Sequence, residues 1–270
     1  MRNQPPVTRE QKEFFRANGY LAYGPILTPQ EVESLRNEVQ LLIELKKPNF
    51  YRADLARAAA DPRPYLGQLA DEPEPTFGQE KFLQMLGLWR VNEAIRKITL
   101  DKRRAQIAAE LLEVSSVRLL SDMVLSKPGG GSPPTYWHQD YPDHPTSLPD
   151  VTAWIALDAT FLANGCMHYL PGSHTRGELV PYDYEGGAGV VKAGVDTSAA
   201  VAVEMQPGDV TFHHSLTLHY AGANQTTQAR RAYITRYMPA QTVYRFRKPG
   251  RDDKEREGEA FSDLDYPIIV

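Results

Sequence analysis

The sequence predicts an α+β fold in which a helical N-terminal part precedes a β-sandwich or jelly roll. Helix-start signals lie near the N-terminus, and after Val114 the chain changes to short β-branched and aromatic runs separated by Gly, Pro, Asn and Asp. With 270 residues, 41% of them hydrophobic, the chain can bury one full core, so we expect a single domain over 1–270. Its helical part should cover about 1–115, its β part about 116–240 and a tail about 241–270.

The first two helices are predicted from their capping residues. Thr8 and Gln11 have the spacing of a capping box, and Gly19 stands where a left-handed residue would end the helix. Thr28 is a second N-cap, followed by proline at the first helical position and by the reciprocal Glu31. One buried face of this second helix follows from the spacing of Val32, Leu35, Val39 and Leu42, and the helix should end before Pro48.

A third helical segment is expected from about Val91 to Leu112, where apolar positions recur among many Lys and Arg. Its charged face is interpreted as solvated surface. Residues 49–90 mix Pro, charged and aromatic residues without a period, so irregular structure over the body of the domain is expected there, in the position of a substrate lid.

The β part contains six predicted strands. Each is a short run of β-branched or aromatic residues bounded by turn formers, as in antiparallel sheets: Val117–Ser126, Val151–Thr160, Met167–Leu170, Val201–Met205, Asp209–His213 and Arg231–Met238. Six strands after a helical part favour a sandwich or jelly roll.

Composition excludes several classes of partner. The 30 basic and 34 acidic residues give a net charge of -4, without the basic surplus of nucleic-acid binding proteins. No apolar run approaches the ~20 residues that span a bilayer, and the N-terminus lacks the apolar region of a signal peptide. The lone Cys166 cannot form an intramolecular disulfide and is expected to be a buried hydrophobe. We therefore expect a cytoplasmic protein without nucleic-acid or membrane partners, with residues 248–257 forming an exposed, mobile charge run.

A metal-binding pattern occurs at Tyr136-Trp137-His138-Gln139-Asp140. Residues two apart on a strand share a face, so His138 and Asp140 are expected to reach one ion. Two imidazoles and one carboxylate form the facial triad of non-haem Fe(II) oxygenases, which requires a second histidine downstream. His-x-Asp alone is weak evidence, because surface hydrogen-bonded pairs share this spacing.

The second histidine is found in the segment 208–224. A strand enters from Gly208-Asp209, His219 lies near its end, and Arg230 follows eleven positions later. Together with the first motif, this combination is much harder to obtain by chance.

On these residues the chain resembles the phytanoyl-CoA dioxygenase family. The resemblance covers most of the chain: the helix-strand-helix opening around Asn18-Gly19-Tyr20, Lys127-Pro128-Gly129, the His-Gln-Asp motif, Trp154-Ile155-Ala156-Leu157-Asp158, Pro171-Gly172-Ser173-His174 and the block from His219 to Arg230. It implies a double-stranded β-helix, a cupin-like jelly roll, with the N-terminal helices packed on one sheet.

The resemblance also implies the cofactors and the roles of five residues. His138, Asp140 and His219 match the iron ligands, and Arg230 matches the arginine that pairs with the distal carboxylate of 2-oxoglutarate, for which a guanidinium offers two parallel donors. Trp154 matches an aromatic position lining the co-substrate pocket, although it also fits plain core. The implied enzyme uses Fe(II) as its cofactor, consumes 2-oxoglutarate and O2, hydroxylates a small metabolite, and releases succinate and CO2.

One position departs from the family pattern. Many relatives carry a serine two residues after the distal histidine that assists the arginine, and here that position is Ala221. His213 and His214 are interpreted as structural or as supporting the ligands, and His174 as organising a turn.

Alternatives to an oxygenase remain at this stage. A cupin-type isomerase or epimerase would share the jelly roll but would carry His-x-His in the first motif and would not need Arg230. A non-catalytic metal-binding protein would be expected to lack one of the ligands. Amino acids, secondary metabolites and acyl derivatives all stay open as substrates, and the sequence predicts no oligomeric state.

Overall fold

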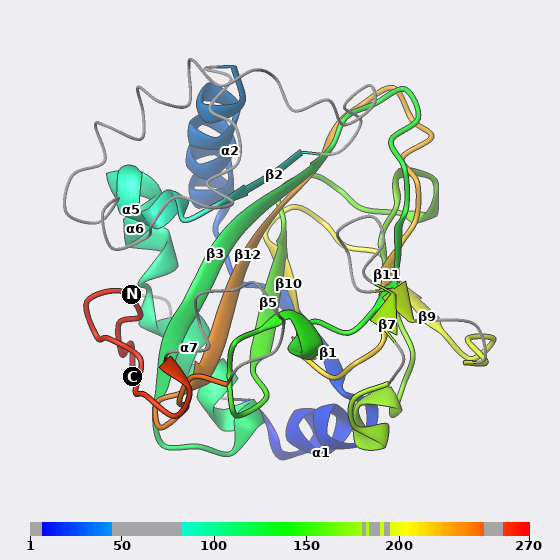
Figure 1. Ribbon diagram of the computed structural model, residues 1–270. Helices are drawn as coiled ribbons and strands as arrows, with labels where there is room; N and C mark the ends of the chain where they lie inside the picture. The colour runs from blue at the N-terminus through cyan, green and yellow to red at the C-terminus, as the bar shows by residue number, and fades with distance from the viewer. Residues whose placement is uncertain (1–6, 45–82, 180–181, 184–189, 192–194, 246–255) are drawn as a thin grey trace.

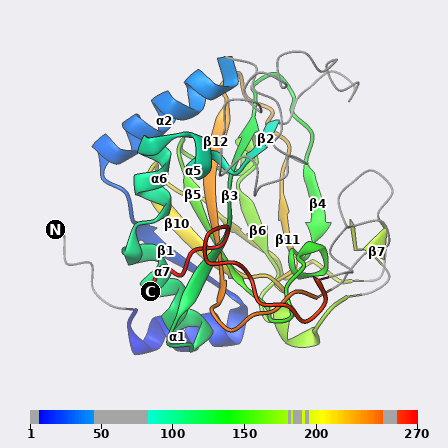
Figure 2. The same ribbon diagram turned by 60° about the vertical axis from the view of Figure 1, so that its left-hand side comes forward.

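The computed structural model describes residues 7–44, 83–179, 182–183, 190–191, 195–245 and 256–270. A six-stranded antiparallel sheet has the order β1-β10-β5-β12-β3-β2, and a four-stranded sheet the order β4-β11-β6-β9. Helices α2, α5, α6 and α7 cover one face of the larger sheet, and the smaller sheet lies on the opposite side (Figure 1). The turned view shows the same arrangement of layers (Figure 2). The predicted α+β fold with a jelly-roll core and helices on one sheet is confirmed.

The helices are α1 (Arg9–Asn18), α2 (Pro29–Glu44), α5 (Leu88–Val91), α6 (Glu93–Thr99) and α7 (Lys102–Leu112). The strands of the larger sheet are β1 (Tyr20–Pro25), β2 (Leu83–Leu86), β3 (Val117–Lys127), β5 (Val151–Ala156), β10 (Asp209–His214) and β12 (Arg230–Pro239). The smaller sheet contains β4 (Thr135–His138), β6 (Met167–Tyr169), β9 (Val201–Val203) and β11 (His219–Ala221). A two-stranded sheet pairs β7 (Tyr182–Asp183) with β8 (Val190–Val191).

The first two helices begin as their sequences predict. Thr8 and Gln11 form the capping box of α1, and Gly19 ends it with φ 78°. At α2 the Thr28 amide donates to Glu31 at 2.7 Å, and the Glu31 amide donates to the Thr28 hydroxyl at 3.2 Å. The predicted buried face of α2 is confirmed.

The third helical segment differs from its prediction in two ways. It is broken into α6 and α7, because Asp101 caps a new helix by accepting from the Arg103 amide at 2.8 Å. Its basic residues do not all face solvent, since Arg104 is completely buried. The stretch expected to be irregular also contains β2 and the start of α5, whose lengths are too short to produce a periodic pattern. Its remainder, including the predicted lid, lies outside the described residues.

The six predicted strands are all present, with shifted ends. β5 is the most shortened, because the amides of Leu157 and Asp158 both donate to the Arg231 carbonyl, at 3.0 and 3.4 Å, and turn the chain out of the ladder. Cys166 is buried and free, as predicted. Most of the predicted mobile charge run, 248–255, lies outside the described residues. Within the described part of the chain, no helix is long and apolar enough to cross a membrane.

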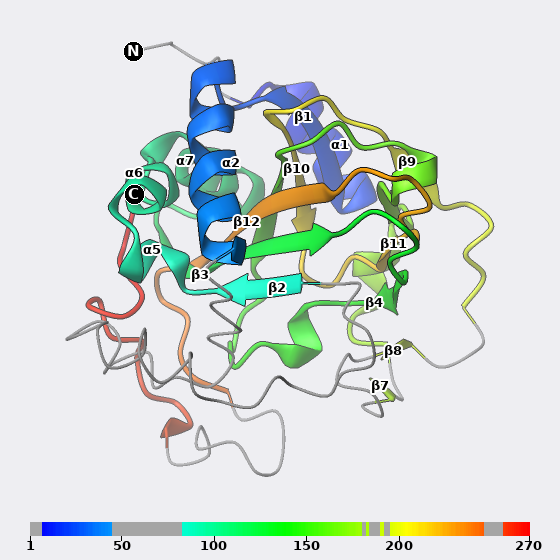
Figure 3. The same ribbon diagram turned by 90° about the horizontal axis from the view of Figure 1, so that it is seen from above.

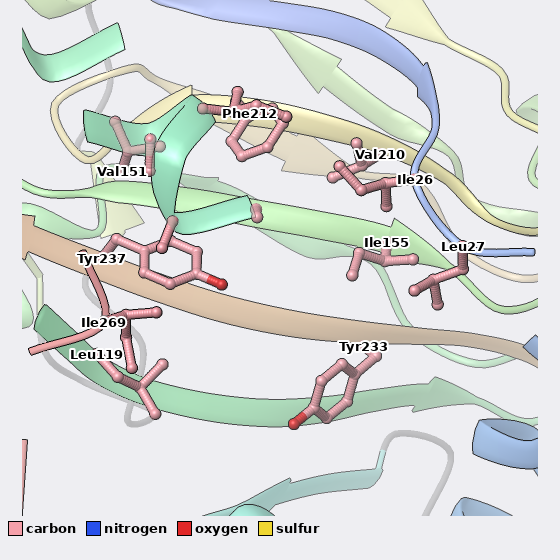
Figure 4. Close-up of a cluster of buried hydrophobic side chains, with 14 of the residues drawn as sticks. Ile26, Leu27, Leu119, Val151, Ile155, Val210, Phe212, Tyr233, Tyr237 and Ile269 are labelled. Atoms are coloured by element: carbon pink, nitrogen blue, oxygen red, sulfur yellow. The ribbon is translucent and has the colours of Figure 1, made fainter. Parts of the chain in front are cut away.

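Each face of the larger sheet packs against its own hydrophobic cluster. The first fills the space between this sheet and the helices, and Figure 4 shows Val210, Phe212, Ile155, Tyr233 and Tyr237 projecting into it from three neighbouring strands. The second lies between the two sheets and includes Met123, Trp154, Met167, Tyr169 and Ile234. Seen from above, α2, α5, α6 and α7 stand on one side of the larger sheet and β4 and β11 on the other (Figure 3). The site described below lies on the β4 and β11 side.

Candidate metal centre

Three residues predicted as metal ligands meet between the sheets. One ligand atom from each of His138, Asp140 and His219 lies within 4.8 Å of the others. Asp140 Oδ1 is 3.7 Å from His138 Nε2 and 3.9 Å from His219 Nε2. The two histidines are direct partners across β4 and β11, which places their ring centres 4.1 Å apart.

The local backbone differs from the prediction at two ligands. Asp140 does not continue the strand of His138, because the chain has already turned into the short 3₁₀ helix Tyr141–Asp143 that Asp140 precedes. His219 does not end the strand that enters from Gly208-Asp209, since β10 stops at His214 and His219 begins β11 in the other sheet. The three candidate ligands lie together as predicted, although the elements predicted to carry Asp140 and His219 were wrong.

Backbone carbonyls fix which nitrogen of each ligand histidine carries the proton. His138 Nδ1 lies 2.8 Å from the Tyr136 carbonyl, and His219 Nδ1 lies 2.9 Å from the Thr217 carbonyl. A carbonyl can only accept, so both rings donate from Nδ1 and present the lone pair of Nε2 to the site. This orientation is the usual support of a metal-bound imidazole.

The charge states also suit a divalent metal. Burial, followed by the neighbouring His138 and His213, holds the pKa of His219 well below its usual value, so the ring is neutral near pH 7. Burial alone would raise the pKa of Asp140, but Arg236, His213 and His219 outweigh it and keep that pKa well below its usual value. The neutral imidazole of His219 and the ionised carboxylate of Asp140 suit Fe(II), and a site with two imidazoles and one carboxylate leaves open positions for other ligands.

Three residues without a predicted role hold Asp140 or its neighbours. The Thr152 hydroxyl donates to Asp140 Oδ2 at 3.0 Å, and Arg236 Nη2 lies 3.3 Å from Oδ1. The fully buried Gln139 side chain donates to the Leu216 carbonyl at 2.6 Å and to the Gly177 carbonyl at 2.9 Å, which ties the loop before His219 to the first motif. Only Gln139 had a signal in the sequence, its position between two ligands.

His213 supports the site from β10. Its ring is 1% exposed, its Nε2 lies 3.4 Å from Asp140 Oδ2, and its centre is 4.5 Å from that of His219. The other histidines have separate partners: His144 with Asp150, His168 with the Cys166 carbonyl, His174 with the Arg16 carbonyl and His214 with the Leu216 amide.

Arg230 and Trp154 line the same pocket as the three ligands. Arg230 is 1% exposed, its Nη2 donates to the Gly165 carbonyl at 3.1 Å, and its Cζ lies 5.3 Å from the centre of the Trp154 ring. Its Nε has no acceptor among the described residues, and burial lowers its pKa to about 10. A buried guanidinium without a carboxylate partner is suited to an acidic ligand.

The adjacent Arg231 has the opposite arrangement. Its Nε and Nη2 donate to the two oxygens of Asp158 at 2.9 and 3.0 Å, and its amide donates to the same carboxylate. The guanidinium of Arg231 is therefore paired with Asp158, whereas that of Arg230 lines the pocket.

Lys127 lies beside the position where the family serine is replaced. Its Nζ donates to the carbonyls of Ala221, at 3.1 Å, and Gly222, at 2.5 Å. Burial, with a smaller contribution from Arg230, lowers the pKa of this lysine to about 7. An amine that titrates near neutral pH thus stands next to Ala221 and close to Arg230.

The comparisons with known proteins agree with this geometry. Residues 15–232 match the family model "Phytanoyl-CoA dioxygenase (PhyH)". The peroxisomal phytanoyl-CoA dioxygenase of Mus musculus is 28% identical over 242 residues, covering 84% of this chain and 67% of its own. A methylphosphonate hydroxylase of Gimesia maris is 25% identical over 230 residues, covering 85% of this chain and 80% of its own.

Solved structures show the same fold. The crystal structure of the epimerase SnoN in complex with Fe3+, alpha ketoglutarate and nogalamycin RO has a TM-score of 0.74 at 25% identity, over 97% of this chain and 98% of that one. The carbocyclase SnoK from nogalamycin biosynthesis also has a TM-score of 0.74, at 24% identity, over 99% and 100% of the two chains.

Proposed function

The chain belongs to the phytanoyl-CoA dioxygenase family, and on that premise we propose that it hydroxylates an unactivated C–H bond of a small metabolite, releasing succinate and CO2. As a member of this family it is an oxygenase that uses iron, 2-oxoglutarate and O2. The observation that carries the proposal is the meeting of His138, Asp140 and His219 in the pocket that Arg230 also lines, where the buried Nε of this arginine has no acceptor among the described residues.

Each residue has a definite task in this reaction. His138, Asp140 and His219 hold iron, which together with 2-oxoglutarate and O2 supplies an oxidising power that no side chain possesses. Arg230 binds the distal carboxylate of 2-oxoglutarate, because its buried Nε is a donor that the described residues leave without an acceptor. Trp154 packs against that guanidinium and keeps water from it.

Hydroxylation is favoured over halogenation by Asp140. A halogenase of this class leaves the carboxylate corner vacant for chloride, whereas the ionised Asp140 occupies it here. The similarity to an epimerase and a carbocyclase makes stereochemical inversion or ring closure the second candidate, since both begin by breaking a C–H bond.

Succinate formation from 2-oxoglutarate under air, with and without Fe(II), tests the oxygenase assignment. The wild type should turn over slowly without substrate, His219→Ala should lose iron binding and turnover, and Arg230→Ala should keep the metal but require far more 2-oxoglutarate. Binding of iron and 2-oxoglutarate is measured separately by calorimetry without O2. A wild type that binds neither would contradict the proposal.

Product analysis separates the two outcomes. A metabolite mixture is incubated with the enzyme under ¹⁸O₂, and hydroxylation predicts a product that gains one labelled oxygen atom. A product of unchanged mass, or one that has lost two hydrogens without gaining oxygen, would replace hydroxylation by the second candidate.

A further inference from the structure

The described lining of the pocket carries an excess positive charge. Among its residues, Asp140 is the one carboxylate, whereas Arg230 and Arg236 are both cations. Iron(II) and 2-oxoglutarate carry equal and opposite formal charges, so loading the site leaves the excess in place.

The two arginines serve different ends of this pocket. They lie on the same face of β12, six residues and therefore about 20 Å apart along the strand. Arg230 contacts Trp154 and the Gly165 carbonyl, where the proposed function places the distal carboxylate of 2-oxoglutarate. Arg236 contacts Asp140, at the metal end. The distal carboxylate of 2-oxoglutarate neutralises Arg230, so the remaining positive charge of the loaded pocket is that of Arg236.

Arg236 is only loosely held by Asp140. Its Nη2 lies 3.3 Å from Oδ1, longer than the ~2.7–2.9 Å of a tight charge-assisted hydrogen bond. Its Nε is buried and finds no acceptor in the described part of the chain, while 15% of the side chain remains exposed. Oδ1 is also the oxygen that faces both ligand histidines, so a bound metal competes for it.

Arg231 shows what a structural arginine looks like in the same strand. Its three donors, Nε, Nη2 and the amide, reach Asp158 at 2.9, 3.0 and 2.9 Å. Arg236 has no such pairing. A buried guanidinium donor without an acceptor destabilises the fold unless a ligand supplies the missing acceptor.

We propose that Arg236 binds an oxyanion of the substrate, a carboxylate or a phosphonate, beside the metal ligands. This inference rests on the proposed function and adds a substrate class to it: an anionic metabolite whose oxidised C–H lies only a few bonds from its acidic group. A planar guanidinium recognises both kinds of oxyanion, and the surrounding apolar side chains strengthen that attraction.

The test uses protein loaded with Mn(II), verified by its paramagnetic resonance signal, and with 2-oxoglutarate, which occupies Arg230. The probes are propionate, methylphosphonate and the neutral propionamide, whose binding is followed by saturation-transfer NMR. Either anion, but not propionamide, should bind the wild type in the millimolar range. Arg236→Gln should weaken that binding about tenfold or more, Arg236→Lys should retain part of it, and Arg231→Gln should leave it unchanged.

Three other results overturn the inference, and a fourth contradicts the proposed function on which it rests. Wild-type protein that loads but binds neither anion, or binds propionamide equally well, has no oxyanion site at Arg236. If Arg236→Gln weakens Mn(II) binding but not anion binding, the arginine only positions Asp140. Failure of the wild type to load with Mn(II) and 2-oxoglutarate would instead contradict the proposed function, on which the inference depends. The anion that binds more tightly identifies the substrate as carboxylate or phosphonate.

Discussion

The two faces of the six-stranded sheet are both buried but differ in chemistry. Toward the helices, β10, β5 and β12 present Phe212, Ile155 and Tyr233 to a continuous hydrophobic cluster. Toward the smaller sheet, alternate residues of the same strands include His213, Thr152 and both pocket arginines. Since side chains alternate along a strand, one backbone supplies both faces, and stability and chemistry can be varied separately.

The neighbours Arg230 and Arg231 show this difference most directly. Arg231 is paired with Asp158, while Arg230 is buried with only a carbonyl acceptor among the described residues. Removing one member of a charge pair leaves the other uncompensated and destabilises the fold, whereas an unpaired buried charge opposes folding until a ligand arrives. Substitutions on the two faces should therefore change different measurements.

The largest effect is expected on the helix-facing side, for Phe212→Ala. Phe212 is fully buried, so the substitution should lower the free energy of unfolding by about 3–5 kcal/mol, as measured by urea denaturation. The KM for 2-oxoglutarate should not change, because the ring points away from the pocket. Phe212→Leu, which keeps most of the volume, should lose much less stability. A raised KM at unchanged stability would show that the two faces are coupled.

A smaller effect, on binding rather than stability, is expected for Arg230→Gln. Losing the buried partner of a carboxylate should raise the KM for 2-oxoglutarate about 100-fold, corresponding to ~3 kcal/mol. The melting temperature without co-substrate should stay the same or rise, because the variant removes a buried charge that lacks a carboxylate partner.

The matched control is Arg231→Gln. It leaves Asp158 without its main partner, so it should lower the free energy of unfolding by about 1–3 kcal/mol and leave the KM unchanged. If Arg231→Gln raised the KM and Arg230→Gln did not, the assignment of the co-substrate arginine would be reversed.

The sequence predicted local features better than long-range ones. The caps at Thr8 and Thr28 depend on contacts three residues apart, and both are present. The contacts of Arg236 and Thr152 with Asp140 arise only when β12, β5 and the turn after β4 are brought together, and nothing in the local pattern indicates them. The prediction that Asp140 lies on the same strand as His138 was wrong for a similar reason. The backbone turns after His138, where the Tyr141 amide donates to the distant Ser215 carbonyl.

The smallest predicted effect is a pH dependence that comes from Lys127. Burial lowers the pKa of this lysine from its ordinary value to about 7, so it gains a proton as the pH falls through neutrality. A second positive charge then stands beside Arg230, and the dianionic co-substrate should bind more tightly. We expect the KM for 2-oxoglutarate, measured at saturating metal, to rise about threefold to tenfold between pH 6 and pH 8.

The same lysine should affect stability with the opposite sign. Its pKa is lower in the folded protein than in the unfolded chain, so from about pH 7 upward the unfolded state binds more protons and stability increases with pH. Lys127→Met should remove both dependences, leaving a KM that is flat with pH and near the high wild-type value. If Lys127→Met kept the wild-type slope, the pH dependence would come from another group, and Lys127 would serve only to hold the Ala221 and Gly222 carbonyls. If Lys127→Met flattened the pH profile of the KM but not that of stability, the lysine would act on the co-substrate without contributing to the pH dependence of folding. Binding and stability would then be separable at this residue too, as they are for the two faces of the sheet.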